Sequence, residues 1–199
     1  ESAVAGNDDD LKLAVDDLAQ KASVKYRQSR MSQAERLRES RNSGISTRCY
    51  YSVPMGKFED RVKPAAGLAV MGESRILCIG SVDIMGVAAG FFLNQECDTP
   101  ADPDKSLNLG CLFGGAGCGY YASESVMFRI NALGGYVRTG VEGGEDLHSN
   151  DMAILGDIEM RYLTDVGLFF SIHSSYLNVW YSGTDLREFL AGIGLGYAF

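Results

Sequence analysis

The chain contains very little tryptophan and proline, with one Trp and four Pro in 199 residues. It also has no run that approaches the roughly 18 consecutive apolar residues of a membrane-spanning helix, which excludes a helical membrane protein. What the chain does contain is glycine, at 24 residues, together with ten Tyr and nine Phe. A composition rich in glycine and aromatic residues is typical of an all-β protein.

The sequence lacks the residue patterns of a metal or cofactor site. Its five Cys are scattered without a C-x-x-C pair or a nearby His, so no metal and no cofactor is predicted. Two interpretations of the thiols stay open. In an oxidising compartment Cys97 and Cys111, which flank one loop, are the first candidates for a disulfide. Otherwise the thiols act as small apolar residues in the core or against lipid.

A run of glycines at 114–119 is followed by neither a Lys-Ser/Thr pair nor a helical pattern, so it does not predict a phosphate-binding loop. Within a strand, such glycines permit bending or a close approach of another chain segment.

Charge is distributed unevenly along the chain. The net charge is −5 over residues 1–20, +6 over 21–48 and −9 over the remainder. A basic block can contact nucleic acid or an anionic surface. This block is short, carries no aromatic residues at stacking spacing and precedes an acidic domain, so we expect no nucleic-acid partner.

The region before Gly44 has helical periodicity. Apolar residues recur at helical spacing from Leu11 to Ala22 behind an acidic run, which predicts an amphipathic helix over about residues 9–40, with a break near 29–32. Its second half has too narrow an apolar stripe to form a core. We therefore interpret residues 1–45 as a charged arm that binds a partner, with the following candidate contact residues: Leu11, Val15, Leu18, Arg27, Arg30, Arg36 and Arg38.

After Gly44 the periodicity changes from 3.6 to 2. In the segment 126–136, for example, apolar residues alternate with Arg129, Asn131 and Gly135. The pattern predicts eight strands, at about 46–56, 63–72, 75–95, 107–121, 126–141, 151–163, 166–181 and 188–199. The third of these is long enough to contain a bulge or a turn near Ser81 to Asp83.

The connections between these strands decide the architecture. Those at 73–74, 122–125 and 164–165 are tight, whereas those at 57–62, 96–106, 142–150 and 182–187 are longer and mostly polar. Regular alternation of short and long connections is the pattern of an antiparallel up-and-down barrel that spans a bilayer. The sequence therefore predicts an eight-stranded transmembrane β-barrel over residues 46–199, preceded by a helical arm.

The end of the chain resembles a known signal. Gly194, Tyr197 and the terminal Phe199 have the spacing of the C-terminal assembly signal of Gram-negative outer-membrane β-barrels, among which the small OmpA-like eight-stranded barrels are similar in size. The resemblance implies an outer-membrane location, contact with outer-membrane lipid and lipopolysaccharide, and insertion by the outer-membrane assembly machinery. Gly192 departs from the family pattern, which usually has a polar residue there.

An eight-stranded barrel is just wide enough for side chains to fill, so no pore is expected. The strand alternation places five polar residues on the inner face, where isolated charges are costly and are expected to pair. They are Arg129, Asp157, Glu159, Arg161 and His173.

Two classes of function follow from these observations. The first is a non-enzymatic membrane anchor or accessory subunit of a cell-envelope assembly, whose arm lies in the periplasm and docks another envelope protein or identical subunits in a ring. The second is a lipid-modifying enzyme, because His173, Ser175 and Glu188 are similar to the His-x-Ser and downstream Glu of outer-membrane lipid A deacylases. The strand alternation points these three side chains into the barrel and away from acyl chains, which favours the anchor.

Overall fold

The computed structural model describes residues 15–23, 41–97, 105–142, 147–181 and 184–199. The chain divides into two compact units, Glu1–Ser40 and Arg41–Phe199. The predicted helix 9–40 falls in the first unit, where the structure describes a helix over residues 15–23. No helix in the described part of the chain is long and apolar enough to cross a membrane.

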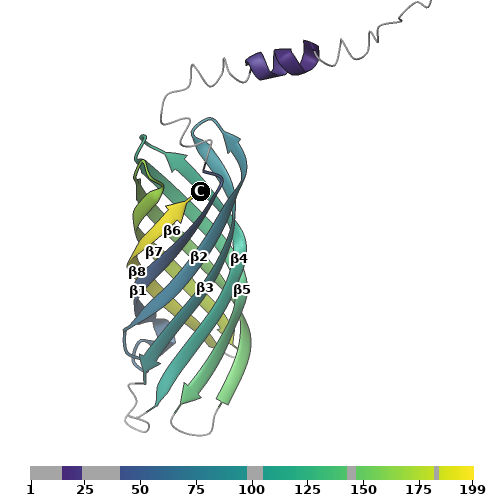
Figure 1. Cartoon of the computed structure of the whole chain (residues 1–199). Helices are drawn as coiled ribbons and strands as arrows, with labels where there is room; N and C mark the ends of the chain where they lie inside the picture. The colour runs from purple at the N-terminus through teal and green to yellow at the C-terminus, as the bar shows by residue number, and fades with distance from the viewer. Residues whose placement is uncertain (1–14, 24–40, 98–104, 143–146, 182–183) are drawn as a thin grey trace, which may run out of the picture. The chain divides into compact units, whose positions relative to one another are not determined.

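The second unit is a closed barrel of eight antiparallel strands, each paired with the next in the sequence and the last with the first (Figure 1). The fold class predicted from the sequence is confirmed. The strands are β1 (Ser43–Met55), β2 (Ala65–Ile79), β3 (Val82–Glu96), β4 (Ser106–Tyr121), β5 (Val126–Glu142), β6 (Leu147–Leu163), β7 (Leu168–Tyr181) and β8 (Thr184–Ala198). A short 3-10 helix, η1 (Gly56–Phe58), follows β1.

The boundary between β2 and β3 differs from the prediction. The expected turn at 73–74 is wrong, because β2 continues to Ile79 and the chain reverses at Gly80, whose φ of 57° suits glycine. An irregularity in the pairing between Arg75 and Leu77 shifts the register just before this turn. The polar run from Glu73 to Arg75, which resembles a turn in the sequence, is part of a strand.

The two ends of the barrel have different connections. At the end that carries Asn42 and Phe199, the strands are joined by residues 80–81, 122–125 and 164–167. At the opposite end, nine residues separate β1 from β2 and nine separate β3 from β4, whereas four separate β5 from β6 and two separate β7 from β8. The predicted long connections at 142–150 and 182–187 are both wrong. β5 continues to Glu142 and β6 begins at Leu147, and β8 begins at Thr184 and pairs with β7 to its last residue. We call the first end the short-turn end and the second the long-loop end.

The outer wall of the barrel is apolar and carries aromatic residues toward both ends. Ile130 and Ile158, which lie opposite one another on β5 and β6, are 63% and 61% exposed. Toward the short-turn end the wall carries Tyr120, Phe128, Tyr162, Phe170 and Tyr197, and toward the long-loop end Tyr51, Phe92, Tyr136, Trp180 and Phe189. An apolar band between two aromatic girdles is the surface of a barrel that spans a lipid bilayer.

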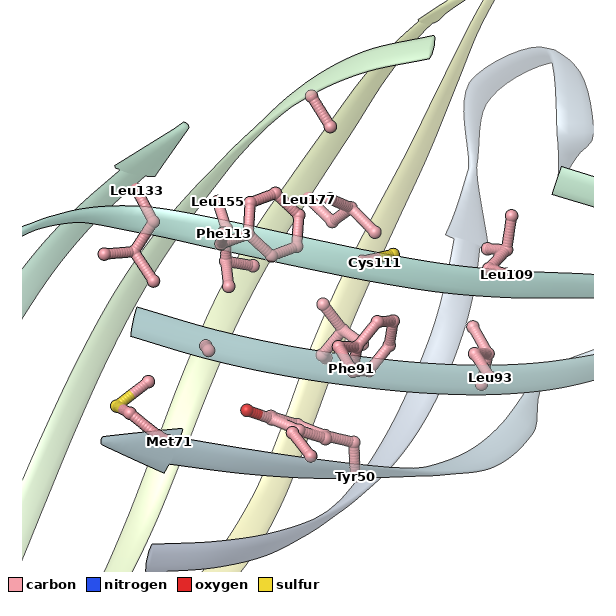
Figure 2. Packing of buried hydrophobic residues seen from close by; sticks show 14 of the residues in the cluster. Tyr50, Met71, Phe91, Leu93, Leu109, Cys111, Phe113, Leu133, Leu155 and Leu177 are labelled. Atoms are coloured by element: carbon pink, nitrogen blue, oxygen red, sulfur yellow. The ribbon is translucent and has the colours of Figure 1, made fainter. Parts of the chain in front are cut away.

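The inner face is filled by side chains. In the half toward the long-loop end the filling is mostly apolar, and Figure 2 shows Leu93 from β3, Leu109 and Phe113 from β4, and Leu177 from β7 converging there. A buried hydrogen-bonded group of Ser52, Gln95 and Glu188 lies in the same half. A cavity among Tyr50, Phe113, Leu177 and neighbouring side chains measures only about 10 Å³. That volume is about one water molecule, so this half of the lumen is packed closed.

Candidate functional site

The half of the lumen toward the short-turn end contains a cluster of buried charges. Three arginines face three carboxylates, so the formal charges of the cluster sum to zero. We call this set the interior network; its members are Arg48, Arg129, Arg161, Glu73, Asp157 and Glu159.

Two glutamates organise one side of the interior network. Arg161 donates to both carboxylate oxygens of Glu73, at 2.5 and 2.7 Å, and Arg129 also donates to Glu73. Glu159 lies 2.6 Å from Arg48 and 2.9 Å from Arg161. Arg161 therefore bridges the two glutamates, and its guanidinium also lies 4.3 Å from the centre of the Phe169 ring.

Asp157 organises the other side of the network. It accepts hydrogen bonds from Arg48 at 3.1 Å, from Asn131 at 2.7 Å and from the hydroxyl of Ser175 at 2.7 Å. Three strands thus donate to one carboxylate on a fourth strand, β6. Because each buried charge has a partner of opposite sign, the network offsets the cost of removing these groups from water and cross-links the barrel through its centre.

The structure places the four charged residues predicted for the interior, Arg129, Asp157, Glu159 and Arg161, inside the barrel, each at most 2% exposed. It adds Arg48 and Glu73, which sequence reasoning missed. Arg48 could have been predicted from the alternation of Ser46, Arg48 and Tyr50 on one face of the strand. Glu73 was missed because the sequence prediction placed a turn at 73–74.

The residues of the enzyme hypothesis are all inside the barrel but do not form a hydrogen-bonded triad. Ser175 donates to Asp157, while Glu188 accepts from Ser52 and from Gln95, the latter at 3.3 Å. Neither ring nitrogen of His173 has a hydrogen-bond partner among the described residues, and its ring packs edge-on against Tyr50 at 4.6 Å between centroids. No acyl chain in the membrane reaches these side chains from the outer wall, because all three are buried in the lumen.

The C-terminal residues close the barrel. The backbone N–H of Phe199 donates to Ser43 at 2.8 Å, and its carbonyl accepts from Asn42 and Ser43 at 2.9 Å. The side chains of Tyr197 and Phe199 are exposed on the outer wall, with ring centroids 6.3 Å apart.

The glycines of the tail are required by packing inside the barrel. A Cβ at Gly194 would lie 2.6 Å from the Ser171 hydroxyl, and one at Gly192 would lie 2.0 Å from the backbone oxygen of Cys49. The same holds for part of the 114–119 run, because a Cβ at Gly117 would lie 2.1 Å from the Asn131 side chain. These glycines make room for neighbouring strands and for the polar lumen.

Of the predicted partner-binding residues, the structure describes Val15 and Leu18. Both lie on the helix 15–23 and are 57% and 66% exposed, and Lys21 forms an ion pair with Asp17 at 2.6 Å on the same helix. The remaining candidates, Leu11, Arg27, Arg30, Arg36 and Arg38, lie outside the described residues.

No disulfide bond joins any of the five cysteines, all of which lie in the described residues. Cys111 is buried in the lumen, whereas Cys49 and Cys118 are exposed on the outer wall. The structure thus corresponds to the interpretation of the thiols as small apolar residues, and Cys97 and Cys111 form no bridge. In the described part of the chain, no group of three or more His, Cys, Asp or Glu side chains could hold a metal ion.

Comparison with known proteins finds solved structures with a similar fold. No family model and no curated protein matches the sequence. Neisserial surface protein A matches in structure with a TM-score of 0.58 at 12% identity, over 79% of this chain and 97% of that chain. Ail, the attachment invasion locus protein of Yersinia pestis, has a TM-score of 0.49 at 14% identity, over 79% of this chain and 99% of that one. At this level of identity the first likeness shows the fold alone.

Proposed function

We propose that this protein is a non-enzymatic outer-membrane protein whose barrel anchors a cell-envelope assembly, and that residues 1–45 dock an envelope partner in the periplasm. The observation that carries the proposal is the filled lumen. The interior network closes the half toward the short-turn end, and mostly apolar side chains, together with the buried Ser52, Gln95 and Glu188, close the other half. A barrel packed in this way offers no passage, which leaves its outer wall, its loops and the N-terminal segment for function.

The orientation of the barrel follows from its connections. In bacterial outer-membrane barrels the short turns face the periplasm and the longer loops face outward. The first barrel residue, Arg41, donates to the carbonyl oxygens of Thr164 and Asp165 in one of the short turns, at 2.9 and 2.8 Å. Arg41 thus lies at the barrel end that we assign to the periplasm.

The N-terminal segment has the chemistry of a docking element. Its described helix exposes Val15 and Leu18, which gain from burial against a partner. The sequence continues into the basic block that contains Arg27, Arg30, Arg36 and Arg38, and this block suits an acidic surface.

The test is affinity purification from detergent-solubilised membranes. We expect the full chain to recover an envelope partner, or further copies of itself, and a chain without residues 1–40 to lose it while the barrel still assembles. Changing Arg27, Arg30, Arg36 and Arg38 to Glu should weaken recovery most at low salt, and the difference from wild type should shrink as salt is raised, because salt screens exposed charges. The same four positions changed to Lys are the matched control and should retain the partner. Recovery that survives both the deletion and the charge reversal would rule out docking by the arm.

A further inference from the structure

The outer wall of the barrel contains an apolar hollow of about 650 Å³ across β1–β4. Volumes of about 300–1,000 Å³ are typical of sites that hold small ligands. Its outward-facing rim includes Leu68 and Phe92, which are 62% and 54% exposed. The outward residues that line the hollow are Thr47, Cys49, Leu68, Val70, Gly90, Phe92 and Gly110.

Two of the residues that line this hollow are glycines, and the packing of the barrel does not require them. A Cβ at Gly110 would meet no atom within 4 Å, and one at Gly90 would meet only Leu112, at 3.8 Å. The inward glycines are different, since a Cβ at Gly117 would collide with Asn131. Glycine in a strand interior costs roughly 0.5–1 kcal/mol relative to alanine, and packing inside the barrel does not require it at Gly90 and Gly110. The same is true of the outward Gly134 and Gly156, which do not line this hollow.

A polar edge borders the hollow on the side of the long-loop end. On β3, β4, β5 and β6 the row of outward apolar residues ends at a polar residue. The side chains of two of these residues, Asn94 and Asn108, are joined by a hydrogen bond of 2.5 Å. Arg138 on β5 lies opposite Gly110 on one side and Asn150 on the other, so neither cross-strand neighbour carries a charge. The polar edge consists of Asn94, Asn108, Arg138 and Asn150.

Arg138 lies at the level of the lipid headgroups. Tyr136, two residues earlier on the same face of β5, is 67% exposed and belongs to the aromatic girdle toward the long-loop end. Aromatic girdles mark the boundary between acyl chains and headgroups. An exposed guanidinium just beyond the girdle is within reach of a phosphate, which it can bind through two parallel hydrogen bonds.

We infer that the hollow and Arg138 together form a binding site for lipid A, the phosphorylated, multiply acylated glucosamine lipid of the outer leaflet. An acyl chain lies in the hollow over Gly90 and Gly110, a phosphate pairs with Arg138, and Asn94 and Asn108 face the sugar. The inference rests on the proposed outer-membrane location with the long-loop end outward. That orientation selects lipid A over phospholipid, because lipopolysaccharide is the anionic lipid of the outer leaflet.

The test uses the purified full-length protein in detergent, with purified lipid A or phosphatidylglycerol added and the complexes measured by native mass spectrometry. We expect Arg138→Gln to weaken lipid A binding about tenfold, the effect of losing about 1.4 kcal/mol of charge-assisted hydrogen bonding. Gly110→Leu should weaken it by a similar factor, because leucine fills the hollow.

Two variants serve as matched controls. Arg187→Gln removes another outward arginine toward the long-loop end, on β8, and Gly156→Leu adds the same side chain at an outward glycine of β6 that has no neighbour within 4 Å. Both should leave lipid A binding within about twofold of wild type, since neither residue lines the hollow. Heat-modifiable migration of all four variants establishes that the barrel is folded.

Each contrary outcome overturns the inference. Equal lipid A binding by the four variants excludes the hollow as the site. Phosphatidylglycerol bound as tightly as lipid A, and lost with the same two substitutions, identifies a phospholipid site instead. A Gly110→Leu variant that loses only self-association identifies an interface between copies of this chain. These outcomes are independent of the docking experiment, because none of the substitutions touches residues 1–40.

Discussion

Arg48 and Glu159 form an ion pair through the centre of the barrel, with 2.6 Å between Nη2 of Arg48 and Oε2 of Glu159. The two residues lie on β1 and β6, which are not neighbours in the sheet, and both side chains are fully buried. The pair therefore joins walls of the barrel that backbone hydrogen bonds do not connect, and its contribution to stability is open to measurement.

We expect Arg48→Ala to lower the free energy of unfolding by about 3–5 kcal/mol, because the substitution leaves Asp157 and Glu159 buried without this cation. Urea unfolding of the protein in lipid vesicles measures the change. The control is Lys63→Ala, which breaks an ion pair with Glu96 whose side chains are 47% and 72% exposed. Its effect should stay below about 1 kcal/mol. Similar losses for the two variants would contradict the structural role of the interior network.

A second prediction concerns the facing of the strands. Ile158→Arg should destabilise the barrel by about 2–4 kcal/mol if this exposed position on β6 meets lipid near the middle of the bilayer. Ile158→Leu, which keeps the side chain apolar, should change the free energy of unfolding by less than about 1.5 kcal/mol. A harmless arginine at this position in vesicles would indicate that the wall faces water.

The glycines provide a third prediction, because inward and outward positions should respond in opposite directions. Gly192→Ala places a Cβ 2.0 Å from a backbone oxygen of β1 and should destabilise the barrel by about 1–3 kcal/mol. Gly156→Ala, with open space around the new methyl group, should be neutral or stabilise by up to about 1 kcal/mol. Unfolding midpoints of the two variants that shift in the same direction would count against the facing assigned here.

The fourth prediction separates the anchor from the enzyme. Replacing His173, Ser175 and Glu188 by Ala together should leave the lipid A mass spectrum of the host membrane unchanged, since these side chains are buried in the lumen and do not bond to one another. The comparison strain lacks the gene entirely. A lipid A species that disappears in both strains would establish the lipid-modifying alternative.

The fifth prediction concerns assembly. Phe199→Ser keeps the backbone hydrogen bonds of residue 199 to β1 but removes the exposed ring. If the aromatic side chain is the assembly signal, this variant should accumulate in the periplasm without heat-modifiable migration. Phe199→Tyr is the conservative control and should assemble normally. Normal outer-membrane recovery of Phe199→Ser would show that the ring is dispensable.

Period-2 alternation determined much of the fold from the sequence alone. Alternation predicted strands with one apolar face, and the connections between them then favoured a barrel in lipid, where every backbone polar group must be paired internally. The same alternation assigned the facing of Ile130 and of Arg129, because neighbouring residues in a strand point to opposite faces.

Tertiary structure decided the pairing. Alternation tells which face a residue occupies but not which residue lies opposite, since register depends on where each turn falls. The polar residues from Glu73 to Arg75 resemble a turn locally, yet Glu73 remains in β2 because its carboxylate pairs with Arg129 and Arg161 from β5 and β6. In the same way, the sequence places Arg48 in the basic block at 21–48, whereas the structure places its side chain in the lumen. There Asp157 and Glu159 offset its charge. The interior network depends on the closure of β1 against β8, and no local stretch of sequence encodes that contact.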